Sequence, residues 1–283
     1  MKPQNKKIGS IRFFFDRLEK LDLDNHSEDV FYFRGHSDHE GFELHPSIYR
    51  DQKWIKNEHR IFREIIMKCP NDFSGAKTTF EKLVKMQHYS LPTRLLDLTS
   101  NPLAALFFAA NQYPDKDGKV LIFKVPMNKI KYYDSDTVSV LANLAKRPED
   151  FDIEEIRNLD KIKFNQEKRI NYLLHEIKEE KPYFEPAIDK EDIESVVCVK
   201  PKLDNPRIIR QDGAFFIFGI KGKKTIPAKI PDDYLVTDES SQLIIKKDGK
   251  KTILTQLARL GINEATMFPE IDSVSKYIKE KLK

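Results

Sequence analysis

One segment constrains the fold of this chain more than any other: residues 86–111, MQHYSLPTRLLDLTSNPLAALFFAAN. Its second half is rich in Ala, Leu and Phe, which is typical of a buried helix, and Thr99, Ser100 and Asn101 are each suitable N-caps. Pro102 fits the first helical turn, where its missing N–H breaks no hydrogen bond. The first half is polar, and polar groups carried to the edge of a core need partners or a ligand. The segment therefore predicts a binding site at the start of a buried helix.

The polar residues of this segment are the first candidates for that site. They are Gln87, His88, Tyr89, Thr93, Arg94, Asp97, Thr99 and Ser100. His88 is a candidate general base. Because no serine or cysteine stands in a nucleophile-elbow context, the sequence does not indicate triad hydrolysis.

Composition sets broad limits. The chain has 283 residues, 40% of them hydrophobic, so it can bury a substantial core in one large domain or two smaller ones. Its net charge of +4 permits a nucleic-acid partner without requiring one. Cys69 and Cys198 have neither disulfide nor zinc spacing, which predicts reduced thiols. No apolar run approaches the roughly 18 residues that span a bilayer, and no signal peptide is evident, so we expect a cytoplasmic protein without membrane contact.

Apolar periodicity predicts both strands and helices. Expected strands are residues 30–34, 119–125, 195–200, 214–220 and 242–246, and expected helices are residues 11–23, 54–69, 78–87, 101–111, 251–260 and 273–283. Residues 138–190 form a charged helical insertion; a solvated surface is the simpler interpretation and a nucleic-acid-facing surface the alternative. We expect one compact α+β domain over residues 1–283, with a mixed, split sheet surrounded by helices.

Three polar groups stand where apolar elements end or begin. Arg34 follows the strand VFYF, Thr99 and Ser100 precede the buried helix, and Gln211 precedes the strand AFFIFG. Binding sites gather at such ends. An arginine fork binds phosphate, hydroxyls at a helix N-terminus add donors, and an amide bonds a sugar hydroxyl, so this set suits a nucleotide. Each residue also has a structural alternative: Arg34 as a partner of Asp97, the hydroxyls as caps, and Gln211 as the end of a turn.

The loop after the first strand, residues 35–50, is expected to bring His36, His39, His45 and Arg50 to the neighbourhood of Arg34. Its histidines lie near Asp38 and Glu40, which raises a metal site as an alternative. Their spacing matches no zinc-binding signature, so we expect no metal.

The chain resembles the FRG domain family, named for an aromatic-Arg-Gly motif that is here Phe33-Arg34-Gly35. Four further segments resemble the family's blocks in its order. They are LHPSIYR (residues 44–50), QHYSLPTRLLDLTSNPLAALFFA (87–109), RIIRQDGAFFIFG (207–219) and LARLGINEATMFPEID (257–272). The resemblance covers most of the chain and implies a single FRG domain, although it implies little about activity.

A second resemblance is to ADP-ribosyltransferases, in the order Arg, then Thr-Ser before a helix, then Gln or Glu at a late strand. It implies that Arg34 holds NAD phosphate or ribose and that Thr99 and Ser100 shape the nicotinamide pocket. Gln211 would bond the ribose, although a neutral amide cannot offer the charge stabilisation of the usual glutamate. Phe33 or Tyr89 would supply a stacking surface, and His88, Thr93 and Arg94 would complete the NAD site.

The leading functional hypothesis is therefore an NAD-dependent ADP-ribosyltransferase, a toxin or phage-defence effector that uses NAD as substrate. Its acceptor would be nucleic acid or protein, and an antitoxin or other regulatory partner would restrain it. The alternative is a non-catalytic sensor that binds a nucleotide or nucleic acid in the same pocket. A nuclease is disfavoured because no acidic metal cluster is evident.

Overall fold

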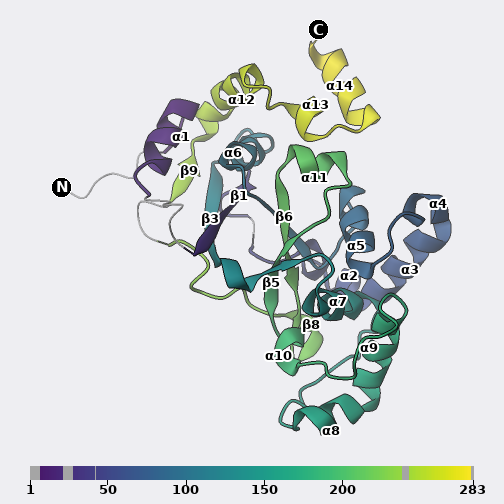
Figure 1. Ribbon diagram of the computed structural model, residues 1–283. Helices are drawn as coiled ribbons and strands as arrows, with labels where there is room; N and C mark the ends of the chain where they lie inside the picture. Colours follow the sequence, from purple (N-terminus) through teal and green to yellow (C-terminus); the bar gives the residue numbers. More distant parts are fainter. Residues whose placement is uncertain (1–6, 22–27, 42, 238–241, 282–283) are drawn as a thin grey trace.

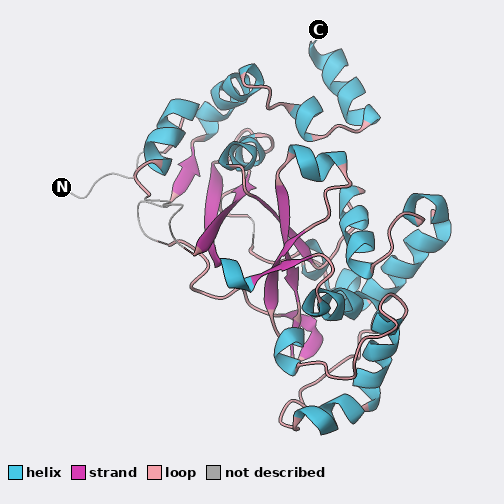
Figure 2. Ribbon diagram, in the orientation of Figure 1, coloured by secondary structure: helices cyan, strands magenta, loops and turns pink. Residues whose placement is uncertain are grey.

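The main sheet of the protein is mixed, as predicted. The computed structural model describes residues 7–21, 28–41, 43–237 and 242–281, and over these the chain is α+β (Figures 1 and 2). The sheet order is β4 (Ile130–Tyr132), β5 (Val196–Lys200), β6 (Gly213–Phe218), β2 (Leu95–Thr99), β1 (Asp29–His36), β3 (Gly118–Pro126), β9 (Leu243–Ile245). β4 and β5 run parallel, and the other neighbours run antiparallel. A separate antiparallel pair is formed by β7 (Ile220–Lys221) and β8 (Lys223–Pro227).

Helices surround this sheet. In chain order they are α1 (Ile11–Leu18), α2 (Gln52–Lys56), α3 (Glu58–Lys68), α4 (Pro70–Phe73), α5 (Thr79–His88), α6 (Pro102–Ala110), α7 (Asp136–Asn143), α8 (Lys161–Gln166), α9 (Lys168–Lys178), α10 (Lys190–Ile193), α11 (Pro206–Arg210), α12 (Lys250–Arg259), α13 (Glu264–Met267) and α14 (Ile271–Lys281). Figure 1 shows α1 and α12 at one end of the molecule and α8 and α9 at the other.

Local sequence signals account for several helix ends. Thr78 and Glu81 form a reciprocal capping box at the start of α5. Of the three N-caps predicted for α6, Asn101 is the one used, since its side chain accepts hydrogen bonds from the first turn. α12 is followed by Gly261 in the left-handed region, with φ +83°, which is typical of a helix C-terminus.

Other local predictions were wrong or incomplete. The helix predicted over residues 54–69 is broken at Asn57, and Pro70 begins α4. The strand β2 was not predicted; its backbone is paired by β1 and β6, which lie far away in sequence. α11 was not predicted; Asn205 caps this helix, which begins at Pro206. α1 ends at Leu18, and the end of the helix predicted over residues 11–23 lies outside the described residues.

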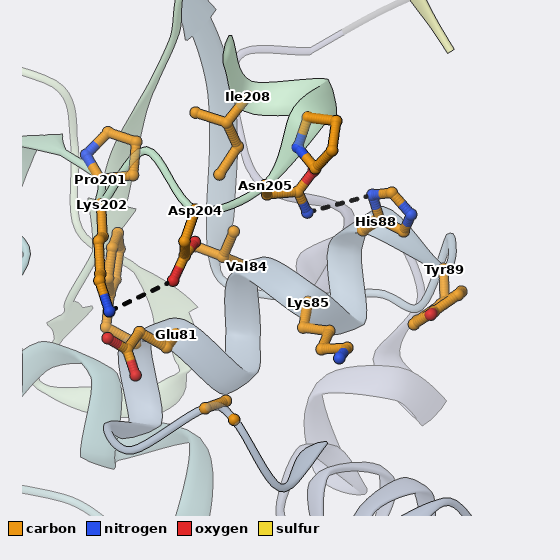
Figure 3. Close-up of a pocket in the computed structure, with 14 residues that line it drawn as sticks. Glu81, Val84, Lys85, His88, Tyr89, Pro201, Lys202, Asp204, Asn205 and Ile208 are labelled. Atoms are coloured by element: carbon orange, nitrogen blue, oxygen red, sulfur yellow. Dashed lines mark hydrogen bonds and ion pairs between the residues drawn. The ribbon is translucent and has the colours of Figure 1, made fainter. Parts of the chain in front are cut away.

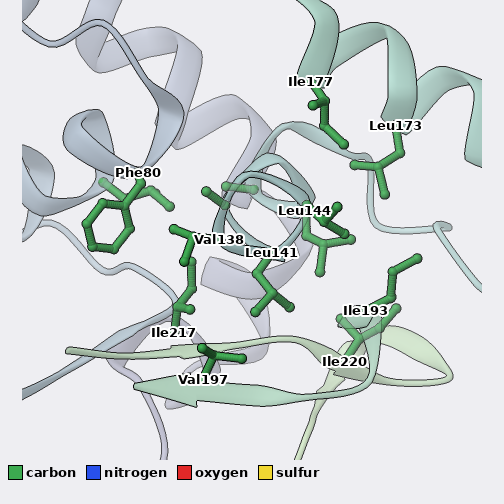
Figure 4. Close-up of a cluster of buried hydrophobic side chains, with 14 of the residues drawn as sticks. Phe80, Val138, Leu141, Leu144, Leu173, Ile177, Ile193, Val197, Ile217 and Ile220 are labelled. Carbon is green, nitrogen blue, oxygen red and sulfur yellow. The ribbon is translucent and has the colours of Figure 1, made fainter. Parts of the chain in front are cut away.

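The segment predicted as a solvated helical insertion is largely helical, but its first helix is buried. Residues 138–145 of α7 and the following turn are all buried, because this helix packs between the sheet and α9. Figure 4 shows Val138 and Leu141 of α7 facing Val197 and Ile217 of the sheet. The expectation of a solvated surface was therefore wrong for α7, which belongs to the core.

Different helices cover the two halves of the sheet. One apolar cluster joins α3, α5, α7 and α9 to β2, β5 and β6, while a second joins α1, α6 and α12 to β1, β3 and β9. A third cluster covers the opposite face of the sheet. The boundary between the first two clusters falls between β1 and β2.

The sheet is weakly paired at this boundary. Within the described residues, β1 and β2 share one registered pair, Phe33 with Thr99, whereas β1 and β3 share eight and β2 and β6 share five. Backbone groups beyond that pair need other partners. The Arg34 guanidinium supplies one, because its Nη1 donates to the Asp97 carbonyl at 2.6 Å. Arg34 therefore lies where two strands stop pairing.

Candidate functional site

A polar cleft lies at this boundary, between the ends of β1, α5 and α6 and the segment around α11 and α13. It encloses about 560 Å³, within the range of about 300–1,000 Å³ that is common for ligand sites. Three arginines line it (Arg34, Arg50, Arg207), with two histidines (His36, His88), three aromatic rings (Tyr89, Phe108, Phe268) and one carboxylate, Glu270, among the described residues. The excess of guanidinium groups over carboxylates favours an anionic ligand.

Arg34 is the most constrained of the arginines. Its Nε donates to His36 Nε2 at 2.9 Å, and its side chain is 14% exposed. Its ion pair with Asp97 is long, 3.9 Å, and Asp97 is 58% exposed, so that pair contributes little. Arg34 and Asp97 were expected as possible partners, and they interact mainly through the hydrogen bond from Arg34 to the Asp97 carbonyl. Because the Asp97 carboxylate offsets little of its charge, the Arg34 guanidinium is suited to bind an anionic ligand.

Charge in the cleft is concentrated on the arginines rather than the histidines. Burial, together with Arg34 and Arg50, lowers the pKa of His36 to about 3, so this ring is neutral and accepts the Arg34 hydrogen bond. Burial also lowers the pKa of Arg34, to about 10, which leaves it protonated at neutral pH. A neutral histidine that orients a charged arginine is a suitable support for phosphate binding.

His88 connects two elements of the cleft wall. Its Nδ1 lies 3.4 Å from the Asn205 amide nitrogen, and its Nε2 lies 3.2 Å from Glu270 Oε1. Burial holds the pKa of His88 below its ordinary value; Glu270 opposes this shift, while Arg207 and Lys85 add to it. The ring is therefore neutral at pH 7.

Arg207 packs over an aromatic ring. Its guanidinium carbon lies 4.7 Å from the centre of the Phe268 ring, and its Nη1 donates to the His88 carbonyl at 3.3 Å. A guanidinium in a cation–π contact retains N–H groups that can donate to an anion. Phe268 also packs on Phe107 and Phe108 of α6, so α6, α11 and the C-terminal segment meet here.

A second cavity adjoins the cleft across His88 and Tyr89. It encloses about 360 Å³ between α5 and residues 201–208. Figure 3 shows the Asn205 amide facing the His88 ring, with Tyr89 at the end of α5. Tyr89 is 52% exposed and meets His88 edge-on, at 5.0 Å between ring centres. Tyr89 is therefore a stacking surface open to both cavities.

The structure brings some predicted site residues together and separates others. Arg34, His88 and Tyr89 line the cleft. Thr99 lies next to β1 but donates to the Gln211 carbonyl at 2.6 Å, and Ser100 is exposed and bonded through its N–H to Asp212. The hydroxyl pair thus lies at the end of β2 rather than inside the cleft.

Gln211 does not present its amide to the cleft. Its Nε2 donates to the Met267 carbonyl at 2.8 Å, and the residue ends α11. It lines a separate hollow of about 30 Å³ with Asp97 and His88. Its contact fixes the C-terminal segment that carries Phe268 and Glu270.

Phe33, Thr93 and Arg94 lie outside the cleft. Phe33 is 4% exposed, within the apolar cluster under α6. Thr93 is fully buried, and its hydroxyl bonds to the Gln87 side chain. Arg94 is also fully buried and forms a two-bond ion pair with Glu58. These three contacts are structural, so the proposed site does not include Phe33, Thr93 or Arg94.

Sequence reasoning missed Arg207, Phe268 and Glu270 as site residues. Each lies more than 90 residues from His88, and an isolated charged residue in a loop carries no pattern of its own. Their signal was the resemblance, since RIIRQDG begins at Arg207 and MFPEID contains Phe268 and Glu270. Arg50 and His36 were expected near Arg34, and both line the cleft.

Uncommon backbone conformations surround the cleft. Among the described residues three that are not glycine have positive φ: Ser90 (61°), Tyr113 (47°) and Asp212 (45°). Ser90 lines the cleft, Tyr113 follows the lining residue Gln112, and Asp212 accepts from Ser100. Such conformations collect at binding sites, where the surrounding structure holds them.

A buried lysine supports the wall of the cleft. Lys250 is 2% exposed, and its Nζ donates to three backbone carbonyls, those of Ser37 (2.7 Å), Gln112 (2.8 Å) and Tyr113 (2.9 Å). Ser37 and Gln112 line the cleft. Lys250 therefore ties the loop after β1 to the end of α6.

Lys250→Met is expected to lower the free energy of unfolding by about 1–3 kcal/mol, because the change leaves buried carbonyls without a donor. Urea unfolding followed by circular dichroism measures this loss. Lys251→Met, at the exposed neighbouring position, is the matched control and should change stability by less than about 0.5 kcal/mol. Equal stability of Lys250→Met and wild type would contradict the supporting role.

Within the described residues no three His, Cys, Asp or Glu side chains are grouped to hold a metal ion. No helix in the same part of the chain has the length and apolar character to cross a bilayer.

Fold and cleft together define an α+β protein with an arginine-lined cleft beside a weakly paired strand boundary. Residues 29–118 match the FRG domain family, so the chain carries an FRG domain. No curated protein and no solved structure matches the chain. The five segments that carry the resemblance all contribute to the cleft, through Arg34, Arg50, His88, Arg207 and Glu270. Segments far apart in sequence therefore share one place in the fold.

Proposed function

We propose that the cleft binds NAD and that the protein transfers ADP-ribose from NAD to a macromolecule, either nucleic acid or protein. The observation that carries the proposal is the convergence of Arg34, Arg50 and Arg207 with aromatic rings and one carboxylate in a single cavity. Arginine forks match the pyrophosphate, and aromatic faces match the nicotinamide and adenine rings.

The arrangement of the strands supports the same proposal. The seven-stranded sheet is weakly paired between β1 and β2, and Arg34 lies at this boundary, which supports an ADP-ribosyltransferase-like arrangement. Thr99, the registered partner of Phe33, lies one position from Arg34 on the neighbouring strand. This agrees with the order of residues that suggested the resemblance.

The proposal is tested with NAD and two arginine variants. Arg207→Ala and Arg34→Lys are each expected to weaken NAD binding about 10- to 100-fold in calorimetry, because each loses charge-assisted hydrogen bonds to the pyrophosphate. Arg210→Ala removes an exposed arginine from the same helix as Arg207, outside the cleft, and should bind as wild type does. Wild-type protein with no affinity for NAD would contradict the proposal.

Labelled NAD separates transfer from binding. Wild type is incubated with single-stranded RNA, single-stranded DNA and a protein mixture, and label on any acceptor supports the transferase. One observation favours the alternative of a non-catalytic sensor: Gln211 is neutral and its amide is bound to Met267. Binding of NAD without nicotinamide release would support that sensor.

A further inference from the structure

We infer that Glu270, and not Gln211, is the carboxylate that acts in the proposed transfer, and that the segment from Met267 to Glu270 is built to hold it in the cleft. This inference rests on the proposed function. It assigns a catalytic role to a residue that lies outside the matched FRG segment 29–118.

Glu270 has unused hydrogen-bonding capacity inside the cleft. Its Oε1 is buried and accepts no well-formed hydrogen bond from the described residues. His88 Nε2 lies 3.2 Å from this oxygen, and the side chain as a whole is 30% exposed. Because His88 is neutral, the carboxylate faces no bonded cation in the described part of the chain. A buried carboxylate oxygen without a full partner is a candidate contact for a ligand.

Three contacts fix the segment that carries Glu270. Met267 is 2% exposed, and its carbonyl accepts from the Gln211 amide at 2.8 Å. Phe268 is packed between α6 and the Arg207 guanidinium. Gln211 thus acts on the cleft through Met267, as a positioning residue.

The proposed transfer needs a negative charge beside the reacting carbon, and Glu270 is the carboxylate that lines the cleft among the described residues. When the bond between ribose C1′ and the nicotinamide nitrogen breaks, its electron pair leaves with nicotinamide, and C1′ takes positive charge shared with the ring oxygen. The hydroxyl or amine of the acceptor then bonds to C1′ and releases one proton. A carboxylate stabilises that positive charge and accepts the proton, which an amide at the same place cannot do.

The test is Glu270→Gln, which keeps the shape of the side chain and removes its charge. We expect NAD affinity within about threefold of wild type and nicotinamide release slowed about 100-fold or more, as for loss of a group that stabilises transition-state charge. Glu155→Gln, at a position that is 83% exposed and remote from the cleft, is the matched control. Thermal unfolding verifies that both variants fold.

Gln211→Glu is the second variant. If residue 211 were the acting position, this change would raise the rate of nicotinamide release; we expect no increase, and a lower melting temperature, because a carboxylate cannot donate to the Met267 carbonyl. Normal release by Glu270→Gln, or a tenfold gain in Gln211→Glu, overturns this inference alone. Wild type that neither binds NAD nor releases nicotinamide overturns the proposed function and the inference together.

Discussion

Glu58→Gln is expected to lower the free energy of unfolding by about 3–5 kcal/mol, because it leaves buried cations without their counter-charge. Glu58 is 1% exposed, and both Arg94 and Lys224 are fully buried beside it. Arg94 Nε donates to Glu58 Oε1 at 2.9 Å, and Lys224 Nζ lies 3.2 Å from Oε2. One carboxylate therefore compensates two cations that have no access to water.

The remaining contacts of this cluster join distant parts of the fold. Arg94 Nη1 donates to the Phe218 carbonyl at 2.9 Å, and Lys224 donates to the Arg147 carbonyl. The cluster thus links α3, the approach to β2, the end of β6 and β8. Loss of Glu58 weakens several elements together, which is why the expected effect is large.

Urea unfolding at pH 7 measures the effect. Glu64→Gln is the matched control, since Glu64 lies on the same helix, is 54% exposed and pairs only with Lys68 among the described residues. We expect that control to change stability by less than about 1 kcal/mol. A Glu58→Gln protein as stable as the control would show that the buried cations are otherwise compensated.

The cluster around Glu58 also makes the free energy of unfolding depend on pH. Burial opposes the Glu58 charge, yet Arg94 and Lys224 together hold the pKa of this carboxyl below its ordinary value of 4.5. A carboxyl with a lowered pKa in the folded state binds fewer protons than in the unfolded chain, so it stabilises above pH 4.5. That contribution is lost as the pH falls through the folded-state pKa. The stability difference between wild type and Glu58→Gln should therefore shrink below pH 4.5.

Sequence patterns predicted the elements whose signals are local. The helix predicted over residues 78–87, the Asn101 cap of α6 and the end of α12 before Gly261 all depend on residues close together in sequence. β2 depends instead on pairing with β6, more than 100 residues away. A strand that forms because of a partner far away in sequence cannot be predicted from the pattern of its own residues.

The predictions for the candidate site also succeeded for some residues and failed for others. Arg34 and His88 were predicted because each borders an apolar element, and both line the cleft. Arg94 has the same local context, but its partner Glu58 lies 36 residues earlier, on another helix. No pattern in either segment distinguishes an arginine that will be buried against a carboxylate from one that will face a ligand. Only the tertiary arrangement separates them.

The glycine of the FRG motif has a steric reason that the structure makes testable. A Cβ atom on Gly35 would lie 2.0 Å from the Ala105 carbonyl oxygen and 2.6 Å from the Ala109 nitrogen, both in the backbone of α6. Real Cβ contacts are never so short, and a helix backbone cannot yield as a side-chain end can. β1 and α6 can pack this closely only with glycine at position 35.

Gly35→Ala is therefore expected to destabilise the fold by about 3 kcal/mol, at the upper end of the range for overpacking. The matched control is Gly75→Ala, because a Cβ at Gly75 meets nothing within 4 Å, and that change should leave stability unchanged or slightly raised. Urea unfolding of both variants measures the difference. Because Arg34 precedes Gly35 and α6 carries Phe108 into the cleft, separation of β1 from α6 should also weaken the NAD binding proposed for the cleft. A Gly35→Ala protein within 1 kcal/mol of the control would mean that α6 moves to accommodate the methyl group, and the cleft would then not depend on this contact.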